Sequence, residues 1–135
     1  MKNPLEAFVG FHLVRTGNLG LKALNSSYGD LPVRHPDVAV AMVIHANPGI
    51  TQSSIGRMLS IQRSNMVPII ARLDQRGWVE RRAGKGKTIG LFISPDGEKV
   101  MPALQAASQS AEDFIAAKIG AEAFEQLRAI LKKIS

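Results

Sequence analysis

Asn65 and Arg72 are side chains of the types that read bases in a nucleic acid. Asn forms two hydrogen bonds with adenine, and Arg forms two with guanine. Ser64 and Asn65 are both strong helix caps, and either one predicts the start of a helix that runs to Arg76. Along that helix Asn65, Pro68 and Arg72 share the stripe opposite the apolar residues. This stripe has the chemistry to recognise bases; the alternative is that its members are only solvated cap and turn residues.

Positive charge is concentrated in the same part of the chain. Residues 51–90 hold eight of the 17 Lys and Arg but only two of the 11 Asp and Glu. The segment therefore carries +6, which is the whole formal net charge of the protein. So concentrated a charge is the electrostatic footprint of a protein that binds a polyanion.

Gln62, Arg63 and Ser64 lie at the predicted N-terminal end of this helix. The first N–H groups of a helix have no partner within it, and the helix dipole favours an anion there. These three residues are therefore candidates for contacts with phosphate.

A glycine-rich hairpin tip, Ala83-Gly84-Lys85-Gly86, lies between two predicted strands. Lys85 and Lys87 alternate with glycines, so the backbone there can approach phosphates closely. With Arg82 they form a cationic projection; the alternative is a charged turn that only aids solubility. Phosphate contacts set affinity and its salt dependence, whereas base contacts set specificity.

Arg81 and Arg82 point to opposite faces of one predicted strand. One of the two is expected to make an internal ion pair, either with Asp74 or beside Glu80.

Pro68 falls in or just past the first turn of the predicted helix. If Asn65 is the cap, Pro68 removes no hydrogen bond of the helix, whereas with Ser64 as the cap one bond is lost. The ring offers an apolar contact to a thymine methyl group. The favoured interpretation is the simpler one, in which Pro68 only stiffens the start of the helix.

The three histidines, His12, His35 and His45, lack the spacing of a helical metal pair, so we expect no metal site and no cofactor. His12 with Arg15 and Asn18 lies along the first predicted helix and is a candidate set for a ligand cavity. A solvent-facing or core histidine is the favoured alternative. No nucleophilic triad, phosphate loop or carboxylate pair is visible, so we expect no enzyme.

The elements that position these residues follow from apolar spacing and from helix start and stop signals. We expect helices over 5–27, 37–46, 52–59, from 64 or 65 to 76, over 95–119 and over 122–134, with strands over 78–82 and 87–93. Thr51 caps the third helix, Gly56 allows close approach by the next one, and Gly77 ends that one. The fold class is mainly α with a small β-hairpin: a winged helix–turn–helix within a helical frame.

Apolar residues at helical spacing mark the expected core. They are Ile55, Met58 and Leu59; Met66, Ile69, Ile70 and Leu73; and Val100, Leu104, Ala107, Phe114 and Ile115. Apolar residues also recur at helical spacing in the first and last helices, at Leu5, Phe8, Val9, Leu13, Leu19 and Leu24, and at Phe124, Leu127, Ile130, Leu131 and Ile134.

The 135 residues form one domain with enough apolar sequence for a core. The absence of Cys excludes a disulfide scaffold and a thiolate zinc site. We expect neither a secretory signal nor a membrane span, and a cytoplasmic location.

The chain resembles the MarR family of bacterial transcription regulators. The similar segments are Pro48-Gly49-Ile50-Thr51-Gln52, then Ile55 to Leu59, Ile70 to Arg81, and Leu91 to Gly97. The resemblance covers essentially the full length, as a single MarR-like domain over 1–135. It implies dimerisation helices in 1–30 and 98–135 and a winged helix–turn–helix over 37–97.

The resemblance also implies a homodimer on double-stranded DNA, most often a repressor at a palindromic operator, which a small phenolic or aromatic acid releases. Residues that it adds to the DNA contacts are Thr51, Gln52 and Val67. The chain departs from the family at Lys85-Gly86-Lys87, where an Asp-x-Arg pattern is common, and at Pro68, where a polar residue is common. The alternative function is a winged helix used for protein contacts.

Overall fold

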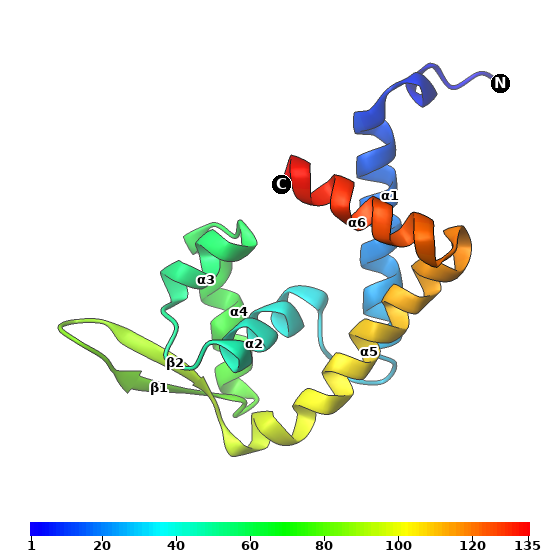
Figure 1. Cartoon of the computed structure of the whole chain (residues 1–135). Coiled ribbons are helices and arrows are strands. Elements are labelled where there is room, and N and C mark those ends of the chain that lie inside the picture. The colour runs from blue at the N-terminus through cyan, green and yellow to red at the C-terminus, as the bar shows by residue number, and fades with distance from the viewer. The chain divides into compact units, whose positions relative to one another are not determined.

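The computed structural model describes all residues 1–135 and is mainly helical, as predicted, with one antiparallel hairpin (Figure 1). The elements are a 3-10 helix η1 (Pro4–Ala7), α1 (Val9–Ser27), α2 (His35–Ala46), α3 (Gln52–Leu59), α4 (Arg63–Gln75), β1 (Val79–Ala83), β2 (Ile89–Ile93), α5 (Pro95–Ile119) and α6 (Ala121–Ile134). They divide into two compact units, which we call the terminal unit (Met1–Leu31 with Ala106–Ser135) and the central unit (Pro32–Gln105). No helix combines the length and the apolar character needed to cross a membrane.

The core of the central unit is formed where α2, α3 and α4 pack together with the hairpin and the start of α5. Its buried members are Val40, Ala41, Ile44, Ile55, Met66, Ile69, Ile70, Leu73, Val79, Leu91 and Met101. The predicted stripe of α4 is confirmed, because all four of its apolar residues are buried. On α3 Ile55 is buried, but Met58 is 58% exposed, so its assignment to the core was wrong.

The start of α3 and its turn into α4 follow from local signals. Thr51 is the N-cap of α3, as predicted, and its hydroxyl accepts a hydrogen bond from the Ser54 amide at 3.3 Å. The helix ends at Ser60, which has a left-handed backbone with φ 54°. The Ile61 amide then donates to the Gly56 carbonyl at 2.9 Å and closes the turn.

Gly56 has a clear steric reason in this turn, since a Cβ there would lie 2.9 Å from the Ile61 carbonyl oxygen. We expect Gly56→Ala to destabilise the protein by about 1–2 kcal/mol, because the overlap with backbone outweighs the better helix propensity of Ala. Urea unfolding would measure this. Ser53→Ala on the same helix is the control and should be neutral within about 0.5 kcal/mol. A Gly56→Ala variant as stable as the wild type would contradict the steric argument.

Helix α4 begins earlier in the chain than predicted. Its N-cap is Gln62, whose extended backbone places its carbonyl to accept from the amides of Asn65 at 2.9 Å and Met66 at 3.0 Å. The prediction of a cap at Ser64 or Asn65 was therefore wrong, because backbone geometry and not side-chain type sets the first turn. Pro68 becomes the sixth helical residue, and the Ser64 carbonyl lacks its usual i+4 donor. Gly77, at φ 73°, follows the C-cap Arg76 as expected.

The hairpin is anchored to the central unit at its base. β1 and β2 pair antiparallel from Val79↔Ile93 to Ala83↔Ile89. Ile50, in the loop before α3, forms a further bridge with Leu91. β2 begins two residues later than predicted, so Lys87 lies in the turn, whereas β1 begins and ends one residue later than predicted.

The terminal unit has few buried side chains. Neither α1 nor α6 contains a buried residue, although both carry the predicted apolar residues at helical spacing. In α5 the buried residues are Met101, Leu104 and Ala111, so only Leu104 of the predicted set is buried, and Phe114 is exposed. The apolar faces are present in the sequence as predicted, but within one chain they remain uncovered.

Candidate nucleic-acid interface

A hollow of about 780 Å³ lies between α3, the start of α4 and the hairpin. Its lining includes the predicted contact residues Thr51, Gln52, Gln62, Arg63 and Lys87. The remaining residues that line it are Ser53, Gly56, Arg57, Ser60, Ile61, Met66, Thr88 and Ile89. The fold thus brings together residues that lie up to 38 positions apart in the sequence, from Thr51 to Ile89.

Three cations without a carboxylate partner, Arg57, Arg63 and Lys87, line this hollow. Arg57 donates to the Ser54 hydroxyl at 3.0 Å, and the Thr51 hydroxyl hydrogen-bonds the same Ser54 oxygen at 3.0 Å. Sequence reasoning missed Arg57. The sequence did contain a signal for it. Arg57 follows Ser53 by four residues and therefore lies on the same face of α3 as Ser53, which is in the first turn after the predicted cap.

Arg72 does not lie where a base-reading residue would. Its guanidinium donates two hydrogen bonds to the Asp37 carboxylate on α2, at 2.9 and 2.7 Å. Asp37 is 1% exposed, and its hydrogen bonds with Arg72 raise the pKa of that guanidinium. The placement of Arg72 on the stripe opposite the core was wrong, because the buried carboxylate draws its side chain toward α2.

Arg76, one helical turn after Arg72, points to the same segment of chain. Its guanidinium donates to the Pro32 carbonyl and lies 5.1 Å from the centre of the Trp78 ring. We call the two side chains, with their partners in residues 32–37, the arginine clamp. The clamp holds the helix α4 against the segment that leads into α2.

The arginines of the hairpin are both paired. Arg81 lies 3.9 Å from Asp74, and Arg82 lies 3.1 Å from Glu80. Arg82 also stacks on the Phe92 ring, with 4.3 Å between the guanidinium carbon and the ring centre. One internal pair was predicted and both arginines make one. Arg82 therefore supports the hairpin, whereas Lys85 and Lys87 keep their charges free at its tip.

The outward side of α4 begins with four exposed residues: Ser64, Asn65, Val67 and Pro68. Ala71 continues it one turn later. Arg63 stands at its N-terminal end, and no other Lys or Arg of the helix faces outward with a free charge. All the predicted α4 contacts except Arg72 are thus placed together on one accessible surface.

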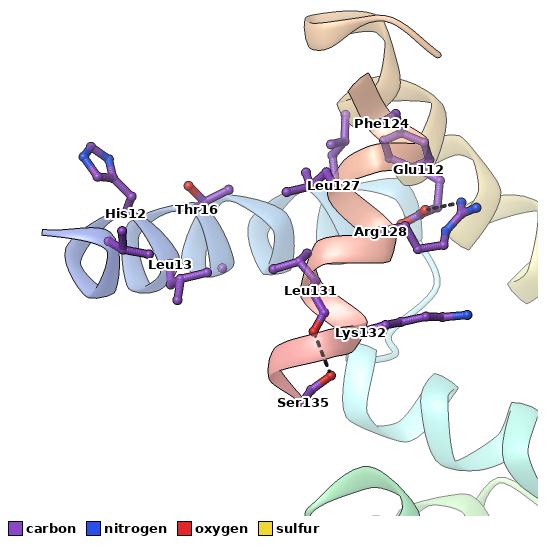
Figure 2. Close-up of a pocket in the computed structure, with 13 residues that line it drawn as sticks. His12, Leu13, Thr16, Glu112, Phe124, Leu127, Arg128, Leu131, Lys132 and Ser135 are labelled. Atoms are coloured by element: carbon purple, nitrogen blue, oxygen red, sulfur yellow. Dashed lines mark hydrogen bonds and ion pairs between the residues drawn. The ribbon is translucent and has the colours of Figure 1, made fainter. Parts of the chain in front are cut away.

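A second hollow, of about 690 Å³, lies within the terminal unit (Figure 2). Its walls come from α1, α5 and α6 and are largely apolar, with Leu13, Leu127 and Leu131 among them. Arg128 bridges from α6 to Glu112 of α5 at 3.8 Å, as the dashed line in Figure 2 shows.

Of the predicted ligand set His12, Arg15 and Asn18, only His12 lines that hollow. Its Nε2 donates to the Glu6 carbonyl at 2.8 Å. Arg15 lies 6.0 Å from the centre of the Phe11 ring, and neither it nor Asn18 reaches the lining. The expected cluster is not brought together, because the side of α1 that lines the hollow carries Val9, Leu13 and Thr16, and at 3.6 residues per turn Arg15 and Asn18 lie on the other side of the helix.

The central unit matches a known family model. Residues 30–87 match the model described as the MarR family. The regulator YybA of Bacillus subtilis, an uncharacterized protein of the helix–turn–helix type, is 23% identical over 112 residues, which are 82% of this chain and 75% of that protein. Residues 30–87 of the chain are thus similar to the MarR family.

Solved MarR-family structures are similar over nearly the whole chain. The repressor CouR bound to a 23-mer DNA duplex has a TM-score of 0.90 and 20% identity, with 99% of each chain covered. CouR bound to p-coumaroyl-CoA has a TM-score of 0.89 and 21% identity, with 99% of this chain and 96% of that chain covered. A mutant of MarR from E. coli, complexed with operator DNA, has a TM-score of 0.86 and 19% identity, with 98% of this chain and 99% of that chain covered. These likenesses show the winged-helix fold, and the MarR-family match over residues 30–87 includes its helix–turn–helix.

Thr88 closes the tip of the hairpin, which is the wing of the winged-helix fold. Its hydroxyl donates to the Lys85 carbonyl at 2.6 Å, and the Gly84 amide donates to the Thr88 carbonyl at 2.9 Å. Gly86 takes the left-handed backbone at φ 66° that the tight turn requires. The tip therefore has its own hydrogen bonds in place of the Asp-x-Arg pattern common in the family.

Proposed function

We propose that this chain is a transcription regulator of the MarR family, which acts as a homodimer that binds a palindromic DNA duplex and represses transcription. The observation that carries the DNA part is the group of free cations at the hollow between α3, α4 and the wing. None of these cations has a carboxylate partner within the chain, whereas every other arginine of residues 51–90 is in an ion pair or donates to a carbonyl. Unpaired cations around a hollow with an adjoining helix N-terminus suit the phosphates of a duplex.

The homodimer is supported by the uncovered helices of the terminal unit. Large exposed apolar residues are concentrated there: Leu5, Phe8, Val9, Leu13, Val14, Leu19, Leu21, Leu31, Phe114, Ile119, Ile130, Leu131 and Ile134. An apolar surface of this extent marks an interface, and a second copy of the same chain offers a matching surface. A two-fold dimer then calls for a palindrome with half-sites about one turn, or roughly 34 Å, apart.

Repression and its release are supported by the relatives. CouR is a repressor, and one of its structures holds p-coumaroyl-CoA, a phenolic acyl compound. By analogy, the effector of this chain is a small aromatic or phenolic acid or its activated form. Such a ligand would lower the affinity for DNA by changing the spacing of the two α4 helices.

Selection from a random duplex library tests the proposal. A palindromic consensus that is bound at least about 1,000-fold more tightly than random duplex is expected for a specific regulator. Binding should weaken steeply between about 50 and 200 mM salt. Enrichment of no sequence, with an affinity that is flat across the salt series, would favour the alternative of a protein-contact module.

The wing lysines should set the salt dependence and not the specificity. Lys85→Ala and Lys87→Ala are each expected to lower the slope of log K against log salt by about 1, since each lysine would neutralise one phosphate. Affinities for the selected and random duplexes should fall by similar factors. Lys99→Ala, which removes a cation paired with Asp96 at 3.8 Å outside the hollow, is the control and should leave the slope unchanged. A loss confined to the selected duplex would contradict a phosphate role.

A further inference from the structure

The outward face of α4 is small and apolar. Ser64, Val67, Pro68 and Ala71 recur at helical spacing, and all four are exposed. Val67 is 54% exposed. Arg72 is not placed to contact guanine, because its guanidinium is hydrogen-bonded to Asp37 in the arginine clamp.

This face lies beside strong positive charge. Arg63, which lines the hollow with Arg57 and Lys87, precedes Val67 by four residues and therefore lies on the same side of α4. A polyanion bound at Arg63 would lie next to Val67, and Pro68 is the following residue on the exposed face. The complementary partner has dense negative charge next to an exposed apolar group.

The major groove of a duplex meets both requirements. Phosphates flank the groove, and the C5-methyl group of thymine is the only apolar group on its floor. Asn65, exposed next to this face, is suited to adenine, the partner of thymine in the same base pair. Pro68 has no N–H and Val67 has no polar atom in its side chain, so neither can replace a methyl contact with a hydrogen bond.

We propose that α4 selects A·T pairs by van der Waals contact of Val67 and Pro68 with thymine methyl groups, with Asn65 on adenine. The inference rests on the proposed function, since it assigns what the DNA-binding helix reads. It gives Pro68, the sixth residue of α4, a role in specificity. It also assigns Arg72 to positioning, not to base contact.

Deoxyuridine substitution tests the inference, because it removes only the methyl group. Each thymine of the selected duplex would be replaced in turn and the affinity of the wild-type protein measured. At one or two positions in each half-site the affinity should fall about three- to fivefold, and about tenfold or more when both half-sites are changed. Duplexes with deoxyuridine at the other positions serve as internal controls.

Val67→Ala and Pro68→Ala then locate the contact on the protein. Each variant should bind the thymine duplex more weakly and lose most of the preference for thymine over uracil at its own position. Met58→Ala is the matched control, since it trims an equally exposed apolar side chain on α3 and should keep the full preference. Thermal unfolding of each variant would show that the fold is retained.

The possible results distinguish the thymine-methyl contact from the proposed binding of duplex DNA. Salt-sensitive, sequence-selective binding with no thymine preference at any position would overturn the methyl contact and leave the proposed function standing. A thymine preference that both α4 variants retain would overturn the assignment to Val67 and Pro68. Absence of any duplex binding by the folded protein would overturn both.

Discussion

Arg72→Met should lower the free energy of unfolding by about 3 kcal/mol, because it leaves the Asp37 carboxylate buried without its partner. Asp37 is 1% exposed and accepts both of its arginine hydrogen bonds at 2.9 Å or less. The Arg72 side chain is 36% exposed, so water can enter where it is removed, and we expect the lower end of the range for a broken buried pair. Urea denaturation followed by circular dichroism measures the difference.

The double variant Asp37→Leu/Arg72→Met separates the loss of an ion pair from the loss of packing. Two apolar side chains of similar volume remove the unpaired charge, so most of the lost stability should return. An Arg72→Met protein within about 1 kcal/mol of the wild type would show that the pair behaves like an exposed one. In that case the arginine clamp would not be what fixes α4 to α2.

The arginine clamp also shows which features of the fold could not be predicted from the sequence. The cap at Thr51, the stop at Gly77 and the buried stripe of α4 depend on neighbours within about one helical turn, and each was predicted. Arg72 instead depends on Asp37, which is 35 residues away and whose burial no local pattern reveals. A buried carboxylate outweighs the helical spacing that placed Arg72 outward.

The candidate DNA surface was predicted in part for the same reason. Residues near helix starts and the hairpin tip, such as Arg63 and Lys87, could be assigned from their local position. Arg57 was missed because its role depends on the shape of the hollow, which α3, α4 and the wing form together. The ligand set on α1 was chosen by residue type alone, and the fold did not bring it to one place.

The terminal unit poses the opposite problem, since its apolar faces were predicted correctly and are not covered. Val9 and Leu13 of α1 and Leu127 and Leu131 of α6 line one hollow in an isolated chain. Burial of each such side chain stabilises the folded or associated state by about 1.5–3 kcal/mol. If a second copy covers them, dimerisation supplies a large part of the stability of this unit.

Leu131→Lys should therefore raise the dissociation constant of the dimer by about 100-fold or more. A two-fold interface contains the substitution twice, each copy loses at least about 1.5 kcal/mol of apolar burial, and each 1.4 kcal/mol is a factor of ten. Analytical ultracentrifugation over a concentration series measures the shift, and the melting temperature of the variant should become more dependent on protein concentration. Gln126→Lys adds the same charge at an exposed polar position of α6 and should leave the dimer intact. A Leu131→Lys protein that dimerises like the wild type would show that α6 is not in the interface, and loss of operator affinity in step with dimerisation would tie the palindrome to the two-fold axis.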